Sequence, residues 1–200
     1  MALTAGRRIA GAVVAFAALA VLATRTAGNG CLARADQEAF DRVKARRTSI
    51  GIALAHTVSG LAEPEVIYPL LAVTSVVALR RADWRRAAIP ALVISAAAAR
   101  RMLSQLIGRP RPPAEAWLIT PEGYSLPSKH TTLAALGAGA GVRALGVRGV
   151  PAHATPALAA VGVGVSRIYL GVHWPADVVA GWLFAEGWLS LTALPGRAAG

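Results

Sequence analysis

The chain has 200 residues, of which 55% are hydrophobic, and its formal net charge at pH 7 is +11. Its mean hydropathy is +0.51, and the apolar residues form long blocks separated by short basic or Pro/Gly-rich segments. This pattern is typical of an integral membrane protein, so the positive charge does not indicate a soluble nucleic-acid-binding protein. Cys31 is the only cysteine, which excludes an intramolecular disulfide.

Six apolar segments approach the length of about 20 residues that a helix needs to cross a hydrocarbon core of about 30 Å. An uncleaved first span is favoured over a secretory signal peptide, because every later segment is also hydrophobic. The predicted fold class is all-α, an integral membrane six-helix bundle in a single domain over residues 1–200. The spans are predicted over residues 9–23, 66–79, 87–106, 131–145, 156–168 and 174–194.

Two shorter segments separate the first and second spans. Residues 34–47 have mixed charge and few apolar positions, which predicts either a helix at the membrane interface or a solvated loop helix. Residues 51–61 are predicted to form a short helix that ends before Glu63-Pro64-Glu65. The proline-rich segment 108–127 cannot form a regular helix, so we expect it outside the bilayer core or along a cavity.

Basic residues indicate the orientation of the spans. Four arginines lie within residues 80–86, and Arg7 and Arg8 precede the first span. The preference of positively charged loops for the cytoplasm places both segments on that side. Some cations predicted on the opposite face are better explained by a phosphate-binding site than by membrane insertion.

Three polar segments, 104–112, 127–130 and 166–177, fall at the ends of predicted spans. Because consecutive spans alternate in direction, we expect all three segments at the same membrane face. Within the third segment, His173 and Asp177 lie one helical turn apart, so the carboxylate can fix the imidazole tautomer. Unpaired polar groups are costly in apolar surroundings, which indicates a functional site at this face.

The polar segments contain the residue types that bind and transfer phosphoryl groups. Guanidinium groups match phosphate oxygens, and a hydroxyl near a helix start adds a neutral donor. Two histidines beside such a pocket can serve as nucleophile and proton donor. Two histidines and one aspartate among many cations would bind a metal poorly, so neither a metal nor a cofactor is expected.

These segments resemble the three signatures of the type 2 phosphatidic acid phosphatase (PAP2) superfamily, which are Lys-x6-Arg-Pro, Pro-Ser-Gly-His and Ser-Arg-x5-His-x3-Asp. The resemblance extends over residues 104–177. The third signature is complete, and the residues that match the three signatures are Arg111, Pro112, Pro127, Ser128, His130, Ser166, Arg167, His173 and Asp177.

The resemblance implies a membrane lipid phosphatase that hydrolyses a lipid phosphomonoester or diphosphate through a phosphohistidine, without a metal. It implies that His173 attacks phosphorus, that Asp177 holds its ring, and that His130 protonates the leaving alcohol and then activates water. The expected partners are a lipid phosphate and the bilayer, without nucleic acid, and the oligomeric state stays open. The expected location is the plasma membrane, with the site on the extracytoplasmic side. The implied phosphate ligands are Arg111, Ser128 and Arg167.

Two departures from the signatures leave the source of one phosphate-binding cation open. Ser104 stands where the first signature has lysine, and Lys129 stands where the second has glycine. Lys129 is the favoured replacement, while Arg100 and Arg101 lie close to the helical face of Ser104 and are alternatives. Ser166 is a further candidate for the site.

Two other functions remain open on the same residues. One is a non-catalytic lipid-phosphate binding or transport protein, which the loss of lysine at Ser104 would favour. The other is a vanadate haloperoxidase, which the hydrophobic chain disfavours. Arg109 is predicted to contact solvent or lipid headgroups rather than the site.

Overall fold

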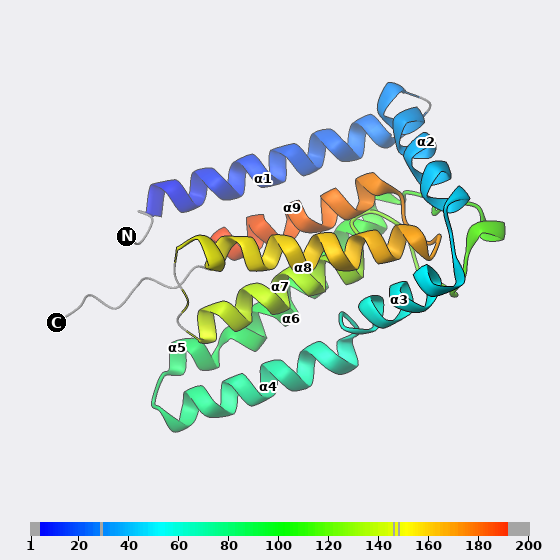
Figure 1. The fold of residues 1–200 in the computed structure, drawn as a ribbon. Helices are drawn as coiled ribbons and strands as arrows, with labels where there is room; N and C mark the ends of the chain where they lie inside the picture. Colours follow the sequence, from blue (N-terminus) through cyan, green and yellow to red (C-terminus); the bar gives the residue numbers. More distant parts are fainter. Residues whose placement is uncertain (1–4, 29, 146, 148, 192–200) are drawn as a thin grey trace.

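The computed structural model describes residues 5–28, 30–145, 147 and 149–191. Every regular element in these ranges is helical, and the long helices lie side by side along one common direction (Figure 1). The long helices are α1 (Ala5–Thr26), α4 (Pro64–Arg80), α6 (Ile89–Ile107), α7 (Lys129–Ala144), α8 (Val150–Tyr169) and α9 (Pro175–Leu191).

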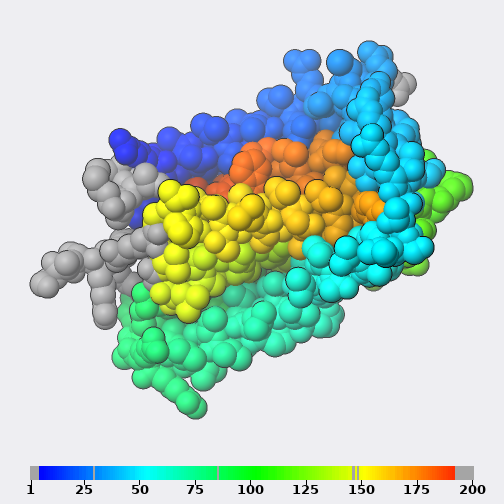
Figure 2. Space-filling model, in the orientation of Figure 1, coloured from blue at the N-terminus to red at the C-terminus, as the bar shows by residue number. Residues whose placement is uncertain are grey.

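The shorter elements lie mainly at one end of this bundle. In Figure 1, α2 crosses that end, and α3 and the segment between α6 and α7 lie beside it. Figure 2 shows the blue and cyan surface of α2 and α3 wrapped over the same end. These elements are α2 (Cys31–Ala45), α3 (Ser49–Gly60), the single turn α5 (Trp84–Ala87) and a 3₁₀ turn (Ala114–Ala116).

The six predicted spans correspond to the six long helices, so the prediction of an all-helical bundle is confirmed. Helix α8 begins at Val150, six residues earlier than predicted, because Pro151 lies in the first turn, where no intrahelical N–H is needed. The helices predicted within 34–47 and 51–61 are also present, as α2 and α3. The end of the last predicted span, residues 192–194, lies outside the described residues.

Length and apolar composition identify two segments of the described chain that are able to cross a membrane. They are Ala5–Thr26 and Ser49–Arg80, and only 22% of each apolar window is buried inside the protein. Their side chains therefore have apolar surface available for lipid. Helices α7, α8 and α9 form the centre of the bundle, where they pack on α1, α3, α4 and α6.

Small residues let the central helices approach closely next to the polar end. A Cβ added to Gly181 of α9 would lie 2.9 Å from the carbonyl oxygen of Ser128, just before α7. A Cβ added to Gly164 of α8 would overlap the side chain of Val178. Larger residues at these two positions would push α7, α8 and α9 apart, so the close contacts fix the helix ends that carry the polar segments.

Candidate active site

A cavity of about 900 Å³ opens where the polar segments meet. All three segments that the sequence indicated contribute to its lining, which confirms that the alternating spans bring them to one end of the bundle. Two further contributors are the start of α4 and the face of α6 one turn before Ser104. The polar residues of the lining include Glu63, Arg100, Arg101, Ser104, Arg111, Lys129, His130, Arg167 and His173.

Local backbone features explain why the chain turns at this end. Helix α6 ends at Gly108, whose left-handed conformation (φ 65°) allows its N–H to bond to the carbonyl of Ser104 at 3.0 Å. Helix α7 begins after Ser128, whose hydroxyl accepts from the N–H of Thr131 as an N-cap. The N–H of Ser128 in turn donates to the carbonyl of Asp177 at 3.0 Å, which ties the starts of α7 and α9 together.

His173 lies in the connection between α8 and α9 and is only 1% exposed. Its Nδ1 is 3.3 Å from Oδ2 of Asp177, and its Nε2 is 3.1 Å from Nη1 of Arg111. A guanidinium group can only donate, so Nε2 must be the unprotonated nitrogen and Nδ1 must carry the proton that Asp177 accepts. The nitrogen whose lone pair is available is therefore the one beside Arg111.

The surroundings of His173 keep its imidazole neutral. Burial is the largest influence and lowers the pKa of His173 well below its usual value, and nearby Arg111 and Arg167 lower the pKa further. A neutral imidazole with a free Nε2 lone pair is the form that a nucleophilic histidine requires.

Asp177 makes two contacts at the start of α9. Its Oδ2 accepts the backbone N–H of Trp174 at 2.8 Å, which caps the start of α9, and the same oxygen lies next to His173. Its Oδ1 pairs with Nη1 of Arg109 at 2.7 Å. The carboxylate is fully buried, so these partners fix its position.

Arg109 was predicted to contact solvent or lipid headgroups, and that prediction is wrong. Its side chain is 9% exposed and bridges Asp177 to Asp36 of α2, with an Nη2–Oδ2 distance of 2.6 Å to Asp36. Asp36 also accepts the backbone N–H of Ala176 at 2.8 Å. The prediction failed because Arg109 is paired through tertiary structure. Helix α2 docks on this end of the bundle and brings the Asp36 carboxylate, which is distant from Arg109 in the sequence.

Asp36 is held in an environment that disfavours its charge. Burial raises its pKa, and the hydrogen bond from Arg109 and the N–H of Ala176 oppose that rise. Asp36 therefore depends on these two donors to remain ionised. The resulting chain of contacts runs from α2 through Arg109 and Asp177 to His173.

Arg111 lies beside His173 and uses all five of its N–H donors. One Nη1 donor reaches the carbonyl of Val172 at 2.7 Å and the other faces Nε2 of His173. The remaining three donate to the carbonyls of Glu122, Gly123 and Tyr124 at 2.7 to 3.1 Å. Arg111 thus holds the loop of residues 122–124, which lines the cavity, against the backbone before His173.

Arg167 is buried (4% exposed) on α8 but still contributes to the cavity wall. Its Nη1 donates to the hydroxyl of Ser59 on α3 at 2.8 Å. Its Nε is buried and has no hydrogen-bond partner in the described part of the chain. Leaving a buried guanidinium donor unpaired is costly, so this side chain is suited to an anionic ligand.

His130 lies in the first turn of α7 and is 6% exposed. Its Nε2 is 2.9 Å from Oε1 of Glu63, the residue that precedes α4. Its Nδ1 is buried without a hydrogen-bond partner among the described residues. Neighbouring Lys129 is half-buried and also lines the cavity.

Helix α6 supplies two arginines near the place where the first signature has lysine. Arg100 is half-buried, and its Nη1 donates to the carbonyl of Pro127 at 3.0 Å. Arg101 is exposed, and Ser104 is 5% exposed, and both line the cavity. Arg100 is therefore the α6 cation that is fixed against the turn before His130.

Two predicted serines lie away from the cavity lining. Ser128 is fully buried, and its hydroxyl oxygen accepts a hydrogen bond from Oγ1 of Thr131 at 3.0 Å. Ser166 donates to the carbonyl of Val163 in its own helix at 2.6 Å. Both hydroxyls have local structural partners because each lies within a helix or at its start.

Sequence reasoning missed three residues that contact the site residues: Glu63, Ser59 and Asp36. Glu63 carried a usable signal, since an ionisable residue between two apolar segments is expensive unless it has a partner or a function. Ser59 and Asp36 carried none, because their partners lie 108 and 73 residues away along the chain. Among the described residues, no three His, Cys, Asp or Glu side chains are grouped as metal ligands.

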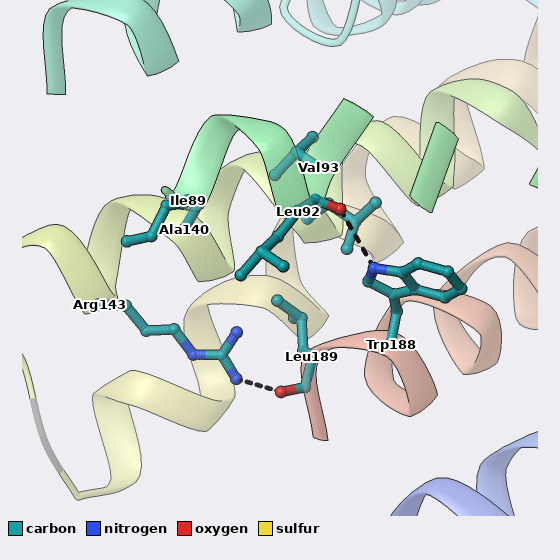
Figure 3. Close-up of a pocket in the computed structure, with 8 residues that line it drawn as sticks. Ile89, Leu92, Val93, Ala140, Arg143, Trp188 and Leu189 are labelled. Carbon is teal, nitrogen blue, oxygen red and sulfur yellow. Dashed lines mark hydrogen bonds between the residues drawn. The ribbon is translucent and has the colours of Figure 1, made fainter. Parts of the chain in front are cut away.

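A second, much smaller cavity of about 20 Å³ is lined by α6, α7 and α9 (Figure 3). Its walls are mainly Ile, Leu, Val and Ala side chains. Its polar contacts are internal: Arg143 donates to the carbonyl of Leu189 at 2.7 Å and Trp188 to that of Leu92 at 3.1 Å. This apolar cavity offers nothing that recognises a phosphate.

Comparisons with known proteins agree with this site. The model of the PAP2 superfamily matches residues 85–195. Decaprenylphosphoryl-5-phosphoribose phosphatase of Mycobacterium tuberculosis is 36% identical over 138 residues, which cover 65% of this chain and 72% of that protein. Undecaprenyl-diphosphatase of Sulfolobus acidocaldarius is 39% identical over 74 residues, which cover 37% of this chain and about a third (34%) of that protein.

A solved structure has the same fold. The crystal structure of a transmembrane PAP2 type phosphatidylglycerolphosphate phosphatase from Bacillus subtilis superposes with a TM-score of 0.78, over 90% of this chain and 92% of that one, at 23% identity. The family match spans more than half of the chain and includes both histidines, Asp177 and the arginines of the cavity. The chain belongs to the PAP2 superfamily and is a membrane lipid phosphatase of that family.

Proposed function

We propose that the enzyme transfers the phosphoryl group of a lipid phosphate to His173 and then to water. The observation that carries this mechanism is the orientation of His173. Its Nδ1 faces Asp177, while its unprotonated Nε2 lies beside the guanidinium of Arg111 at the cavity. Nucleophile, supporting carboxylate and charge-stabilising donor are thus already in contact before substrate binds.

In the first step, Nε2 of His173 attacks phosphorus and the bond from phosphorus to the lipid oxygen breaks. The leaving oxygen receives a proton from His130, which lines the same cavity. In the second step, His130 accepts a proton from water, and this water attacks the phosphohistidine. Inorganic phosphate leaves, and His173 and His130 regain their starting protonation states.

Cations around the cavity would bind the phosphoryl oxygens and stabilise the charge that develops on them. Arg111 and Arg167 come from the first and third signatures, and the unpaired Nε of Arg167 supports an anionic ligand at this wall. We propose that Arg100, rather than Lys129 as the sequence suggested, supplies the phosphate-binding charge of the missing lysine in the first signature. Arg100 is anchored to the Pro127 carbonyl, directly before the α7 turn that carries His130.

The cavity wall indicates how a lipid would bind. Next to the cationic residues, the lining becomes apolar along α4, α6 and α7, where Tyr68, Ile94, Ala97, Ala98 and Leu133 contribute. A headgroup phosphate at the histidines would therefore leave its hydrocarbon chain against apolar side chains. Because two relatives are named for polyprenyl substrates, we propose polyprenyl phosphates and diphosphates as the first substrates to test.

We also propose that the site faces the extracytoplasmic side of the plasma membrane. Arg7 and Arg8 near the N-terminus and the arginines after α4 belong to the opposite end of the bundle from the cavity, which supports a cytoplasmic location for that end.

Phosphate release from a panel of lipids tests the proposed activity. Purified protein in detergent with chelator should release inorganic phosphate from a polyprenyl phosphate, a polyprenyl diphosphate, phosphatidic acid or phosphatidylglycerol phosphate. His173→Ala should lower this release by at least about 10³-fold, as expected for loss of a nucleophile. Binding of these lipids without turnover would instead favour a binding or transport protein, and full activity of His173→Ala would refute the mechanism.

A further inference from the structure

The contact between Glu63 and His130 has no counterpart in the three sequence signatures. Glu63 precedes α4, His130 lies in α7, and the two are 67 residues apart in the chain. The Glu63 carboxylate is 40% exposed, whereas the His130 side chain is 7% exposed. A carboxylate thus reaches from the cavity to a nearly buried imidazole and contacts its Nε2 at 2.9 Å.

His130 is surrounded mainly by positive groups. Lys129 adjoins it in α7, Arg167 approaches from α8, Arg111 from the segment after α6, and His173 from the α8–α9 connection. Burial is the largest influence that disfavours a positive charge on the His130 ring, and the lysine and the two arginines disfavour it further. A histidine that must donate a proton at this position therefore needs a negative partner.

We propose that Glu63 is the counter-ion that stabilises the protonated form of His130, which is the form that protonates the leaving oxygen. This inference rests on the proposed phosphatase mechanism. A carboxylate can only accept, so the proton of the contact lies on Nε2 of His130 and points into the cavity. Nδ1 is buried without a partner, so Nε2 is the nitrogen that substrate can reach.

The two carboxylates of the site then have different effects on their histidines. Asp177 shares its charge with Arg109 at 2.7 Å, so it orients His173 without favouring a proton on Nε2. The Glu63 carboxylate makes its described hydrogen bond with His130 and lies close enough to Arg167 to interact with its charge. During turnover the leaving oxygen replaces Oε1 of Glu63 at Nε2 and takes the proton as its bond to phosphorus breaks. His130 is left neutral, and its free Nε2 lone pair can accept a proton from the attacking water.

Glu63 is therefore a positioning residue that acts through His130, and the pH dependence of kcat/KM tests it. At high pH, kcat/KM falls as the general acid of the free enzyme, here His130, loses its proton. This fall is the basic limb of the pH profile, and it reports on the enzyme state in which the Glu63–His130 contact exists. Removing a neighbouring negative charge makes that proton easier to lose. Glu63→Gln should move the basic limb to lower pH by about one unit, measured on a lipid phosphate that the wild type hydrolyses.

Two matched variants serve as controls. Glu65→Gln changes an exposed carboxylate two residues away, in the first turn of α4, that also lines the cavity, and it should leave the limb in place. Glu63→Asp keeps the charge and should return the limb toward the wild-type position.

An unmoved limb in Glu63→Gln, or an equal shift in Glu65→Gln, would overturn the role of Glu63 while leaving the phosphatase intact. A wild type without turnover on any lipid would instead refute the proposed function itself.

Discussion

The two histidines of the cavity differ in what surrounds their Nε2 atoms. His173 has a guanidinium donor at Nε2 and a carboxylate at Nδ1, which together require an unprotonated Nε2 and a proton on Nδ1. His130 has a carboxylate at Nε2 and an unpaired Nδ1. The first arrangement suits a nucleophile and the second suits a proton donor, which supports the two roles that we propose.

Arg100 provides the sharpest test of how this chain replaces the lysine of the first signature. Its guanidinium lines the cavity and is anchored to the carbonyl of Pro127. Removing one preorganised donor from a charge-stabilising site typically costs about 10²-fold or more in rate. We therefore expect Arg100→Ala to lower kcat/KM for a lipid phosphate by about 10²-fold.

Arg101→Ala is the matched control, because Arg101 is exposed on the next position of α6, and it should change kcat/KM only a few-fold. A Ser104→Lys substitution in the Arg100→Ala protein recreates the signature lysine one helical turn away, and it should recover much of the lost rate. Equal losses in Arg100→Ala and Arg101→Ala, with no recovery by Ser104→Lys, would contradict this role of Arg100.

At the scale of helices, hydrophobic blocks were sufficient to predict the fold. Each long apolar segment became a helix because burial and internal hydrogen bonding favour helices in apolar surroundings. Alternation of their direction was also sufficient to predict that residues 104–112, 127–130 and 166–177 meet. The errors in the predicted fold concern where helices begin and end. Helix α8 begins at Val150 because a proline is tolerated in the first turn of a helix, although in the sequence it suggested that no helix begins there.

The contacts made by α2 and α3 were beyond sequence reasoning. The interaction of Asp36 with Ala176 joins residues 140 positions apart, and that of Ser59 with Arg167 joins residues 108 apart. Such pairs depend on how a short polar helix docks on the bundle end, and the local residue pattern does not encode that docking. Arg109 was misjudged for the same reason, since its two partners lie in α2 and α9.

Helix α2 is connected to His173 through Asp36, Arg109 and Asp177. Asp36 and Asp177 hold Arg109 from two sides, with distances of 2.6 and 2.7 Å. Buried ion pairs contribute little net stability because desolvation offsets their attraction. The value of this network is geometric: it fixes the Asp177 carboxylate that orients His173.

At the scale of the whole molecule, the orientation in the membrane can be tested without changing the sequence. Cys31 is the only cysteine of the chain, and it is exposed at the start of α2, on the end of the bundle that carries the cavity. If this end is extracytoplasmic, a membrane-impermeant maleimide should label Cys31 in intact cells. Labelling only after the membrane is permeabilised would place the cavity on the cytoplasmic side.

The central claim is that His173 carries the phosphoryl group between lipid and water. Rapid quenching of the purified enzyme with a ³²P-labelled lipid phosphate, followed by denaturation in alkali, preserves any phosphohistidine for peptide analysis. We predict label on the peptide that contains His173 in the wild type and none in His173→Ala. A wild type that releases phosphate without any labelled protein, or label that persists in His173→Ala, would contradict the account.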